Sequence, residues 1–497
     1  MNSTDYTEVH GITIPTGLYI NGEHTPAHAG NTFAITNPAT GHTLAHLADA
    51  KSTDALAALT SAHNAQETWA HTTTRHRAEI LREAYTRTQA HAEELATLIT
   101  LEMGKNLTEA HAEVRYGAEY LRWFSEEAPR HYGNTLPTPE GTHLITTIHK
   151  PVGPSLLLTP WNFPLAMATR KLAPAIAAGC TSILKPAEHT PLTLQYFTHL
   201  IADLLPAGVL NTLPTSTPAD ISEPLLADAR LRKISFTGST RVGKQLAAAA
   251  TKHLQRTSLE LGGNAPFIIF EDANLDAALT GATAAKLRNI GQACTAANRF
   301  IVHESLLEEF STRLAELFRT QRLGNGLNPN TDLGPLITPT ARERIHTLVT
   351  DAISQGAQLL AGGYIPTNPE LAEGAYYPAT VLSNVTPDMD IARTEIFGPV
   401  APILSFATEN QAYALANDTE YGLASYVYTA DTARALRAAG HLHYGMAGLN
   451  MGVISNAAAP FGGIKSSGLG REGGAEGIEE YTETQYITLP NPHVATP

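Results

Sequence analysis

Three residues far apart in the sequence have side chains suited to covalent chemistry on a carbonyl group. Cys294, in GQACTAANR, is one of two cysteines in 497 residues, and a free cysteine is more often an inert, buried residue. As a thiolate, however, it is a strong nucleophile. Glu260, in ELGGNAP, could act as a base, and Asn162, in TPWNFP, could donate hydrogen bonds to an oxyanion. Taken singly, Glu260 could also be a solvated carboxylate, and Asn162 could be an amide that satisfies its own turn.

A fourth motif, FTGSTRVG at 236–243, predicts an anion site. A strand turns through Gly238 into a helix, whose first N–H groups lack partners within the helix. Its glycines do not have the G-x-G-x-x-G spacing, so a plain strand-to-helix turn is the alternative. The surrounding elements favour phosphate binding.

Alternating strands and helices must position these residues. Apolar runs predict strands at 143–149, 154–160, 181–186, 233–238 and 265–270. Helices are expected at 164–178, opened by Pro164 and closed by Gly179, and at 241–254. A long amphipathic helix over 75–103 follows an irregular beginning, and further helices are expected at 275–288 and 304–321. The pattern predicts an α/β fold with two domains. A polar strand at 479–490 is expected to pair outside its own domain.

Composition narrows the possible partners. The net charge of −14 argues against nucleic acid or an anionic membrane as a partner, and 43% hydrophobic residues support sizeable cores. Two cysteines do not make a disulfide framework, the beginning lacks a secretory signal, and no run reaches the ~18 apolar residues of a membrane span. We therefore expect a cytoplasmic protein, and no metal site is predicted.

In combination, these motifs resemble the aldehyde dehydrogenase superfamily over nearly the whole chain and in the family's order. The stretches that carry the resemblance are TPWNFPLAMATRKLAPAIAAGC, LKPAE, FTGSTRVG, LELGGNAPF, GQACTAANR, EIFGPV and PFGGIKSSGLGREGG. The resemblance implies that Cys294 attacks an aldehyde, and that Asn162 and the backbone N–H of Cys294 stabilise the oxyanion. Hydride passes to a nicotinamide ring, and Glu260 then activates the water that hydrolyses the thioester.

The resemblance also implies a cofactor site. Its residues would be Trp161, Lys185, Glu188, Gly238, Ser239, Gly243, Glu395 and Phe397. Glu188 would accept hydrogen bonds from ribose hydroxyls and repel a 2′-phosphate, which favours NAD over NADP. Arg241 and Lys185 could offset that repulsion, and 211–228 lacks glycines that many relatives carry beside the adenine, so NADP stays open.

Two arginines could clamp a substrate carboxylate through charge-assisted hydrogen bonds. Arg170, Arg288 and Ser455 resemble the carboxylate-binding set of the succinate-semialdehyde dehydrogenase branch. We therefore expect non-phosphorylating oxidation of succinate semialdehyde to succinate through a thiohemiacetal and a thioester. Glutarate semialdehyde, or another aldehyde, is the alternative, because one methylene is worth only about 1–3 kcal/mol. A non-catalytic scaffold or binding protein is the alternative of another class, but it should have lost one of the three catalytic residues.

Two cysteine positions bear on regulation. Some members of that branch carry a second cysteine two residues after the nucleophile. Here the position is Ala296, so no redox switch is expected. Cys180 is interpreted as a buried structural residue.

The resemblance implies two Rossmann-like α/β domains and a β oligomerisation arm. A nucleotide-binding domain would comprise 1–135 and 154–265, and a catalytic domain 266–466. The arm and tail would comprise 136–153 and 467–497. The exposed edge of the tail strand predicts a homodimer or homotetramer.

Overall fold

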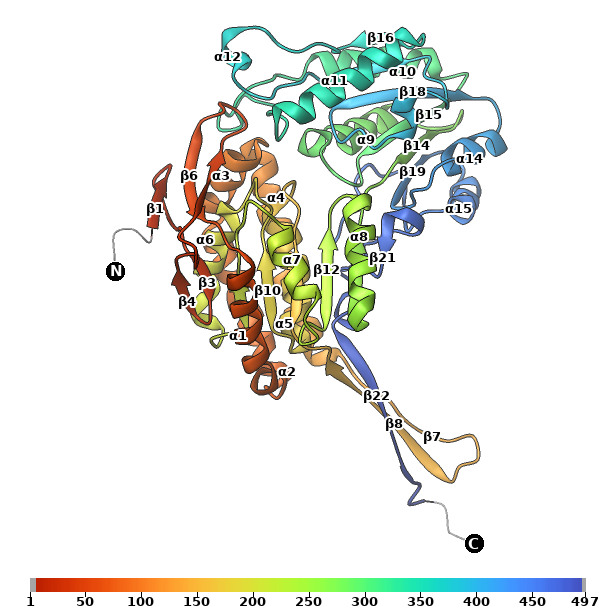
Figure 1. The fold of residues 1–497 in the computed structure, drawn as a ribbon. Helices are drawn as coiled ribbons and strands as arrows, with labels where there is room; N and C mark the ends of the chain where they lie inside the picture. Colours follow the sequence, from red (N-terminus) through yellow and green to blue (C-terminus); the bar gives the residue numbers. More distant parts are fainter. Residues whose placement is uncertain (1–5, 494–497) are drawn as a thin grey trace.

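The computed structural model describes residues 6–493, so residues 1–5 of the expected nucleotide-binding domain and the last four of the tail lie outside the described part. Two α/β bodies lie one above the other in Figure 1, and a narrow β arm projects from the lower one. Within the described residues no helix is long and apolar enough to cross a membrane.

The lower body is built on an eight-stranded sheet in the order β21-β13-β12-β9-β10-β11-β3-β4. Its central strands β9–β13 are parallel, and the short strands at both edges are antiparallel. The strand bounds are β3 Leu18–Ile20, β4 Glu23–Thr25, β9 Ser155–Leu158, β10 Ser182–Lys185, β11 Leu210–Thr212, β12 Lys233–Thr237, β13 Arg256–Glu260 and β21 Gly468–Leu469.

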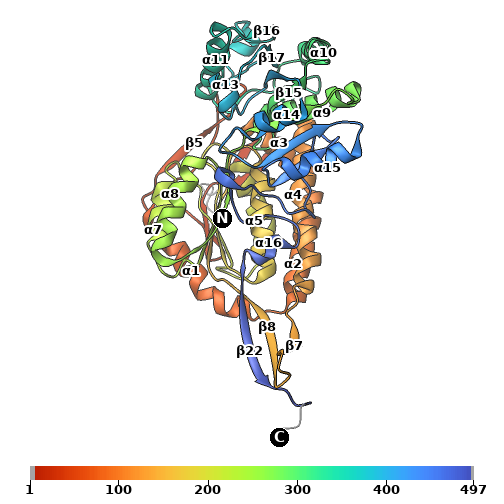
Figure 2. The same ribbon diagram turned by 90° about the vertical axis from the view of Figure 1, so that its right-hand side faces the viewer.

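Helices cover both faces of this sheet, as a buried parallel sheet requires. Figure 2 shows α1, α7 and α8 on one face and α2, α4 and α5 on the other. The helix bounds are α1 Ser52–Ala70, α2 Thr74–Ala90, α3 Ala92–Met103, α4 Leu107–Glu127, α5 Pro164–Ala178, α6 Leu192–Ile201, α7 Ala219–Leu226 and α8 Thr240–Ala250.

The predicted strand–helix–strand unit around Asn162 is confirmed. Strands β9 and β10 pair in parallel, and α5 connects them. Pro164 occupies the first turn of α5, where no N–H is needed, and Gly179 ends the helix at φ 90°, a left-handed conformation that suits glycine. Every residue of α5 is buried, so the loop before it is held firmly.

The upper body contains a seven-stranded sheet in the order β16-β17-β18-β15-β14-β19-β20, parallel except at β16. Its strands are β14 Ala265–Ile269, β15 Ala297–His303, β16 Gln358–Ala361, β17 Thr380–Ser383, β18 Val400–Phe406, β19 Ala424–Tyr428 and β20 Met446–Leu449. Its helices include α9 Leu275–Leu287, α10 Leu307–Arg319, α11 Pro339–Ser354, α14 Glu409–Asn417 and α15 Thr432–His441. Short helices are α12 Pro369–Ala372, α13 Asp390–Arg393 and, in the lower body, α16 Glu476–Glu479.

The arm is a three-stranded antiparallel sheet. The expected tail strand is β22, Thr482–Pro490, which pairs along its whole length with β8, His143–Pro151, and β7, Thr135–Pro137, completes the sheet. Figures 1 and 2 both show the arm standing clear of the two bodies.

Three sequence expectations differ from the structure. The helix expected over 75–103 is two helices, because the backbone leaves helical geometry at His91, whose ring hydrogen-bonds the Tyr196 hydroxyl of α6 at 3.1 Å. The beginning is not irregular, since β1 Tyr6–Val9 pairs with β2 Ile12–Pro15, and β5 Thr32–Thr36 with β6 Thr43–Ala48. Finally, β21, placed with the tail by sequence, extends the eight-stranded sheet beside β13.

Candidate active site

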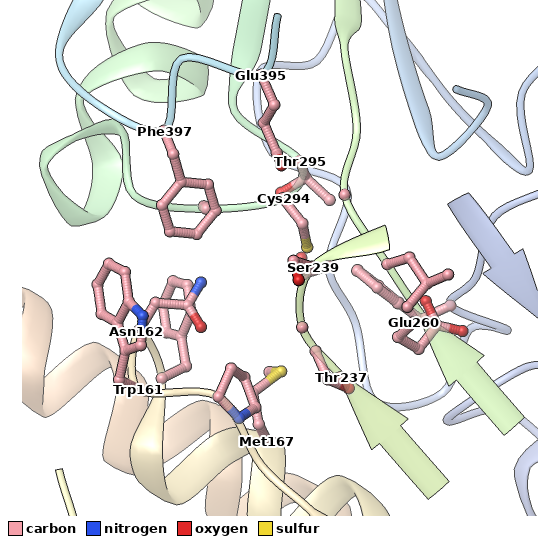
Figure 3. Close-up of a pocket in the computed structure, with 18 of the residues that line it drawn as sticks. Trp161, Asn162, Met167, Thr237, Ser239, Glu260, Cys294, Thr295, Glu395 and Phe397 are labelled. Carbon is pink, nitrogen blue, oxygen red and sulfur yellow. The ribbon is translucent and has the colours of Figure 1, made fainter. Parts of the chain in front are cut away.

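A cavity of about 430 Å³ brings most of the predicted site residues together. Loops, helices and strand ends of the two bodies form its walls, and Figure 3 shows side chains from these elements around it. The predicted residues that line it are Trp161, Asn162, Arg170, Gly238, Ser239, Glu260, Arg288, Cys294, Glu395, Phe397 and Ser455.

Asn162 is oriented by contacts on both its side chain and its backbone. Its Nδ2 donates to the Gln292 carbonyl at 2.9 Å, and its own carbonyl accepts from Lys105 Nζ at 2.9 Å and Asn289 Nδ2 at 3.0 Å. Lys105 is fully buried and also pairs with Glu113 at 2.5 Å. An amide nitrogen carries two hydrogens, and the observed hydrogen bond uses one of them. The other is available to an oxyanion.

Cys294 lies in the loop between α9 and β15 and is half-buried. Burial raises the pKa of its thiol to about 12; the Arg170 guanidinium acts in the opposite direction, and the carboxyls of Glu395 and Glu260 add to the rise. The thiol is therefore protonated in the resting protein and must lose its proton before it can attack a carbonyl carbon.

Glu260 ends β13 and is almost completely buried. Neither of its carboxyl oxygens has a hydrogen-bond partner among the described residues. Burial raises its pKa well above the usual value, and the neighbouring Glu472 carboxyl raises it further. A carboxyl group with a raised pKa and free oxygens is a suitable proton acceptor for a water molecule near neutral pH.

Arg170 lines the cavity, but its guanidinium already forms an ion pair with a carboxylate of the protein itself. Its Nε lies 2.5 Å from Glu472 Oε2, and its guanidinium stacks over the Phe461 ring at 4.1 Å. Lys171 Nζ holds the other oxygen of Glu472 at 2.5 Å. Burial alone would raise the pKa of Glu472, but Lys171 and Arg170 outweigh it and lower the pKa.

Arg288 is in a different situation. It caps α9, and its guanidinium lies over the rings of Phe163 at 5.1 Å and Tyr116 at 5.9 Å. Among the described residues it forms no salt bridge, so its charge is available to an anion in the cavity. Ser455, in the loop after β20, lines the same cavity.

A second cavity, of about 970 Å³, adjoins the first and shares Trp161, Gly238 and Ser239 with it. It extends along the C-terminal ends of β9, β10 and β12, where parallel sheets bind ligands. Lys185 and Glu188 line it, with Nζ and Oε2 3.4 Å apart. The α8 N-terminus, capped by Ser239, also borders it. A cleft of this size, with a carboxylate for ribose hydroxyls and free helix N–H groups for phosphates, fits a dinucleotide.

Gly243 does not lie in the cofactor site where it was expected. It lines neither cavity; its N–H donates to the Ser239 carbonyl at 2.9 Å, and a Cβ there would lie 2.4 Å from Leu261 Cδ2. The residue must be small so that α8 can pack against the segment after β13. Its N–H is therefore already used within the helix.

Glu395 and Phe397 lie where the first cavity meets the upper body. Gly263 N–H donates to Glu395 Oε1 at 3.0 Å, and burial raises the pKa of Glu395 to about 7. The Phe397 ring meets Trp161 edge to face at 5.4 Å. Figure 3 shows this pair on one side of the site and Cys294 and Glu395 beside it.

The sequence motifs predict no role for four buried charged residues at the site: Glu472, Lys171, Lys105 and Glu113. Glu472 lies in the quoted GLGREGG stretch and Lys171 next to Arg170, but about 300 positions separate them, so no local pattern links the pair. Cys180 is buried, as predicted, with Sγ 3.3 Å from the Tyr481 carbonyl.

Comparisons with known proteins identify the family of the chain. The aldehyde dehydrogenase family model matches residues 24–487. The chain is 57% identical to the succinate-semialdehyde dehydrogenase of Paenarthrobacter nicotinovorans over 90% of this chain and 99% of that one. It is 43% identical to a glutarate-semialdehyde dehydrogenase of Pseudomonas putida, over 95% and 97%. A crystal structure of an E. coli NADP-dependent enzyme, 41% identical, superposes with a TM-score of 0.94 over 96% of this chain and 98% of that one. The chain belongs to the aldehyde dehydrogenase family.

Proposed function

We propose that this protein oxidises succinate semialdehyde to succinate with a nicotinamide dinucleotide, through a thiohemiacetal and a thioester on Cys294. The observation that carries the choice of substrate is the free guanidinium of Arg288 in the cavity that holds the Cys294 thiol. A carboxylate at the far end of the aldehyde would satisfy that charge. The name of the Paenarthrobacter relative supports the same substrate.

The chain's own groups account for most of the mechanism. The Cys294 thiol loses its proton to water, its sulfur attacks the aldehyde carbon, and the free hydrogen of Asn162 Nδ2 and the Cys294 backbone N–H stabilise the oxyanion that forms. When bound, the nicotinamide dinucleotide supplies the hydride acceptor. Glu260 then takes a proton from water as the water oxygen attacks the thioester carbon, and the C–S bond breaks to release the acid and restore the thiol.

Lys185, Glu188, Gly238 and Ser239 would hold the dinucleotide from the adenosine side, and Trp161, Glu395 and Phe397 would enclose its nicotinamide end. We propose a preference for NAD, because Glu188 presents a carboxylate beside the ribose position. Burial would raise the pKa of Glu188, but Lys185 outweighs it and the pKa is lowered, so the carboxylate is charged at neutral pH. Arg241 is not among the residues that line the cleft, so it offers little to a 2′-phosphate.

Initial rates test the proposal. We would compare succinate semialdehyde, glutarate semialdehyde and butanal, each with NAD and NADP, on the wild type and on Arg288→Ala. We expect the semialdehydes to exceed butanal in kcat/KM and Arg288→Ala to remove that preference, because truncation leaves the carboxylate unpaired. A higher kcat/KM for butanal in the wild type would refute the choice of substrate.

A further inference from the structure

Two tyrosines on α4 form a hydrogen-bonded pair at the edge of the reaction cavity. Tyr116 and Tyr120 are one turn apart, and their hydroxyl oxygens lie 2.6 Å from each other. Tyr120 is fully buried, whereas Tyr116 is half-buried and lines the cavity that contains Cys294. Neither residue was singled out by the sequence motifs.

The partners of Tyr120 determine the direction of the hydrogen bond between the two hydroxyls. Burial raises the pKa of Tyr120 well above its usual value, and the positive charge of the neighbouring Arg170 guanidinium acts in the opposite direction. A guanidinium is cationic and has no acceptor, so it favours the orientation in which the Tyr120 oxygen faces Arg170 and the Tyr120 proton points away from it. Among the described residues the hydroxyl of Tyr120 hydrogen-bonds that of Tyr116, so in this orientation the Tyr120 proton points to the Tyr116 oxygen.

The Tyr116 proton is then left for the cavity. The Arg170 charge and the hydrogen bond between the two hydroxyls act in the same direction and polarise the Tyr116 hydroxyl, which makes it a stronger donor. The Arg288 guanidinium lies 5.9 Å from the Tyr116 ring centroid. Tyr116 and Ser455 also line an adjoining, more open cavity of about 400 Å³ bordered by α4. Tyr116 therefore lies where the two cavities adjoin.

We propose that Tyr116 is a specificity-determining residue whose hydroxyl donates a hydrogen bond to the carboxylate end of the aldehyde substrate. This inference rests on the proposed function. It also assigns Arg170 an indirect part: the side chain held by Glu472 acts on the substrate through the two hydroxyls.

The test measures kcat and KM for succinate semialdehyde and butanal on the wild type, Tyr116→Phe and Tyr421→Phe. Tyr421 lines the same cavity but does not belong to the hydrogen-bonded tyrosine pair, so it is a matched control for loss of a cavity hydroxyl. In Tyr116→Phe we expect KM for the semialdehyde to rise about tenfold or more with little change in kcat, because a hydrogen bond to a charged group is lost. The kcat/KM for butanal should stay within about twofold, and Tyr421→Phe should keep the wild-type ratio between the two aldehydes.

The results separate the two claims. If Tyr116→Phe leaves the semialdehyde KM unchanged, or lowers kcat/KM equally for both aldehydes, Tyr116 does not read the carboxylate and the inference fails, while a wild-type preference for the semialdehyde would leave the proposed function standing. If the wild type itself prefers butanal, the proposed function fails. Inhibition by succinate gives an independent readout, and its inhibition constant should rise in Tyr116→Phe by the same factor as KM.

Discussion

At the level of single residues, the chemistry depends on how strongly the cavity penalises charge. Burial raises the pKa values of Cys294 and Glu260, and it raises the pKa of Glu395 to about 7. The Cys294 thiol becomes a nucleophile, and the Glu260 carboxyl a base, only after each has lost its proton. The Arg170 guanidinium, itself paired with Glu472, acts against the rise at Cys294 and Glu260, but burial outweighs it.

Alkylation of Cys294 by iodoacetamide in the free protein should therefore accelerate with pH. The thiolate fraction rises about tenfold per pH unit as long as the pH lies below the pKa, and a pKa of about 12 places the whole range from pH 7 to 10 below it. Rates measured by mass spectrometry should show no plateau in that range. Cys294→Ser identifies the reacting site, because buried Cys180 should stay unmodified, and a plateau below pH 8 would show that the site lowers the pKa instead.

Removing the oxyanion donor should slow the chemistry more than it weakens binding. Asn162→Ala is expected to lower kcat by about 10²–10³-fold with a small change in KM, because the amide acts on charge that develops in the transition state. Steady-state kinetics with a circular dichroism check of folding would measure this. An effect confined to KM would place Asn162 in ground-state binding.

At the level of elements, the βαβ unit around Asn162 and the tail strand follow from local patterns: apolar runs, Pro164, Gly179 and the alternation in 479–490. The break at His91 depends on a contact with Tyr196 of α6, and no local signal marks it. The pairing of Glu472 with Arg170 and Lys171 likewise depends on the tertiary fold. Local patterns therefore predicted residues that the fold brings together in one cavity, but not the buried charges that contact them.

The buried ion pair between α4 and the segment before it should stabilise the lower body. Lys105→Met leaves the Glu113 carboxylate without its cation, although its other oxygen still accepts from the Leu165 and Ala166 N–H groups of α5. We expect a loss of about 3–5 kcal/mol. Lys105→Met with Glu113→Gln removes both charges and should recover part of the loss. The midpoint of thermal unfolding measures both variants, and a double variant less stable than the single one would contradict this account.

The end of β10 should set the choice of cofactor. Glu188→Ala removes the charge that repels a 2′-phosphate and leaves Lys185, whose Nζ then lacks its carboxylate partner, to attract one. We expect the ratio of kcat/KM for NADP to that for NAD to rise about tenfold or more. The control is Glu223→Ala, a second carboxylate that lines the cleft but has no Lys185 contact. An equal rise in both variants would indicate general charge repulsion.

At the level of the whole molecule, the arm has the features of an interface with another protein chain. It stands clear of both bodies, and Leu136, Tyr486, Ile487 and Leu489 are exposed on it. The outer edge of β22 has no neighbouring strand among the described residues. An open strand edge with apolar side chains is an interface for another chain. We propose that a second copy of this protein covers it.

Charge on one face of β22 should then break the assembly. Ile487→Lys with Leu489→Lys, two residues on the same face, is expected to halve the mass measured by size-exclusion chromatography with light scattering, because lysine ammonium groups would be buried without partners. Thr488→Lys, on the opposite face, should keep the wild-type mass. If the double variant keeps its mass, the arm is not the interface.

The most direct test of the central claim is mass spectrometry of acid-quenched Glu260→Gln protein after reaction with succinate semialdehyde and NAD. Without the base that activates water, the thioester should accumulate. The account predicts a succinyl group on the peptide that contains Cys294, absent from Cys294→Ser and dependent on the cofactor. Turnover without an acyl group on Cys294, or an acyl group on another residue, would contradict it.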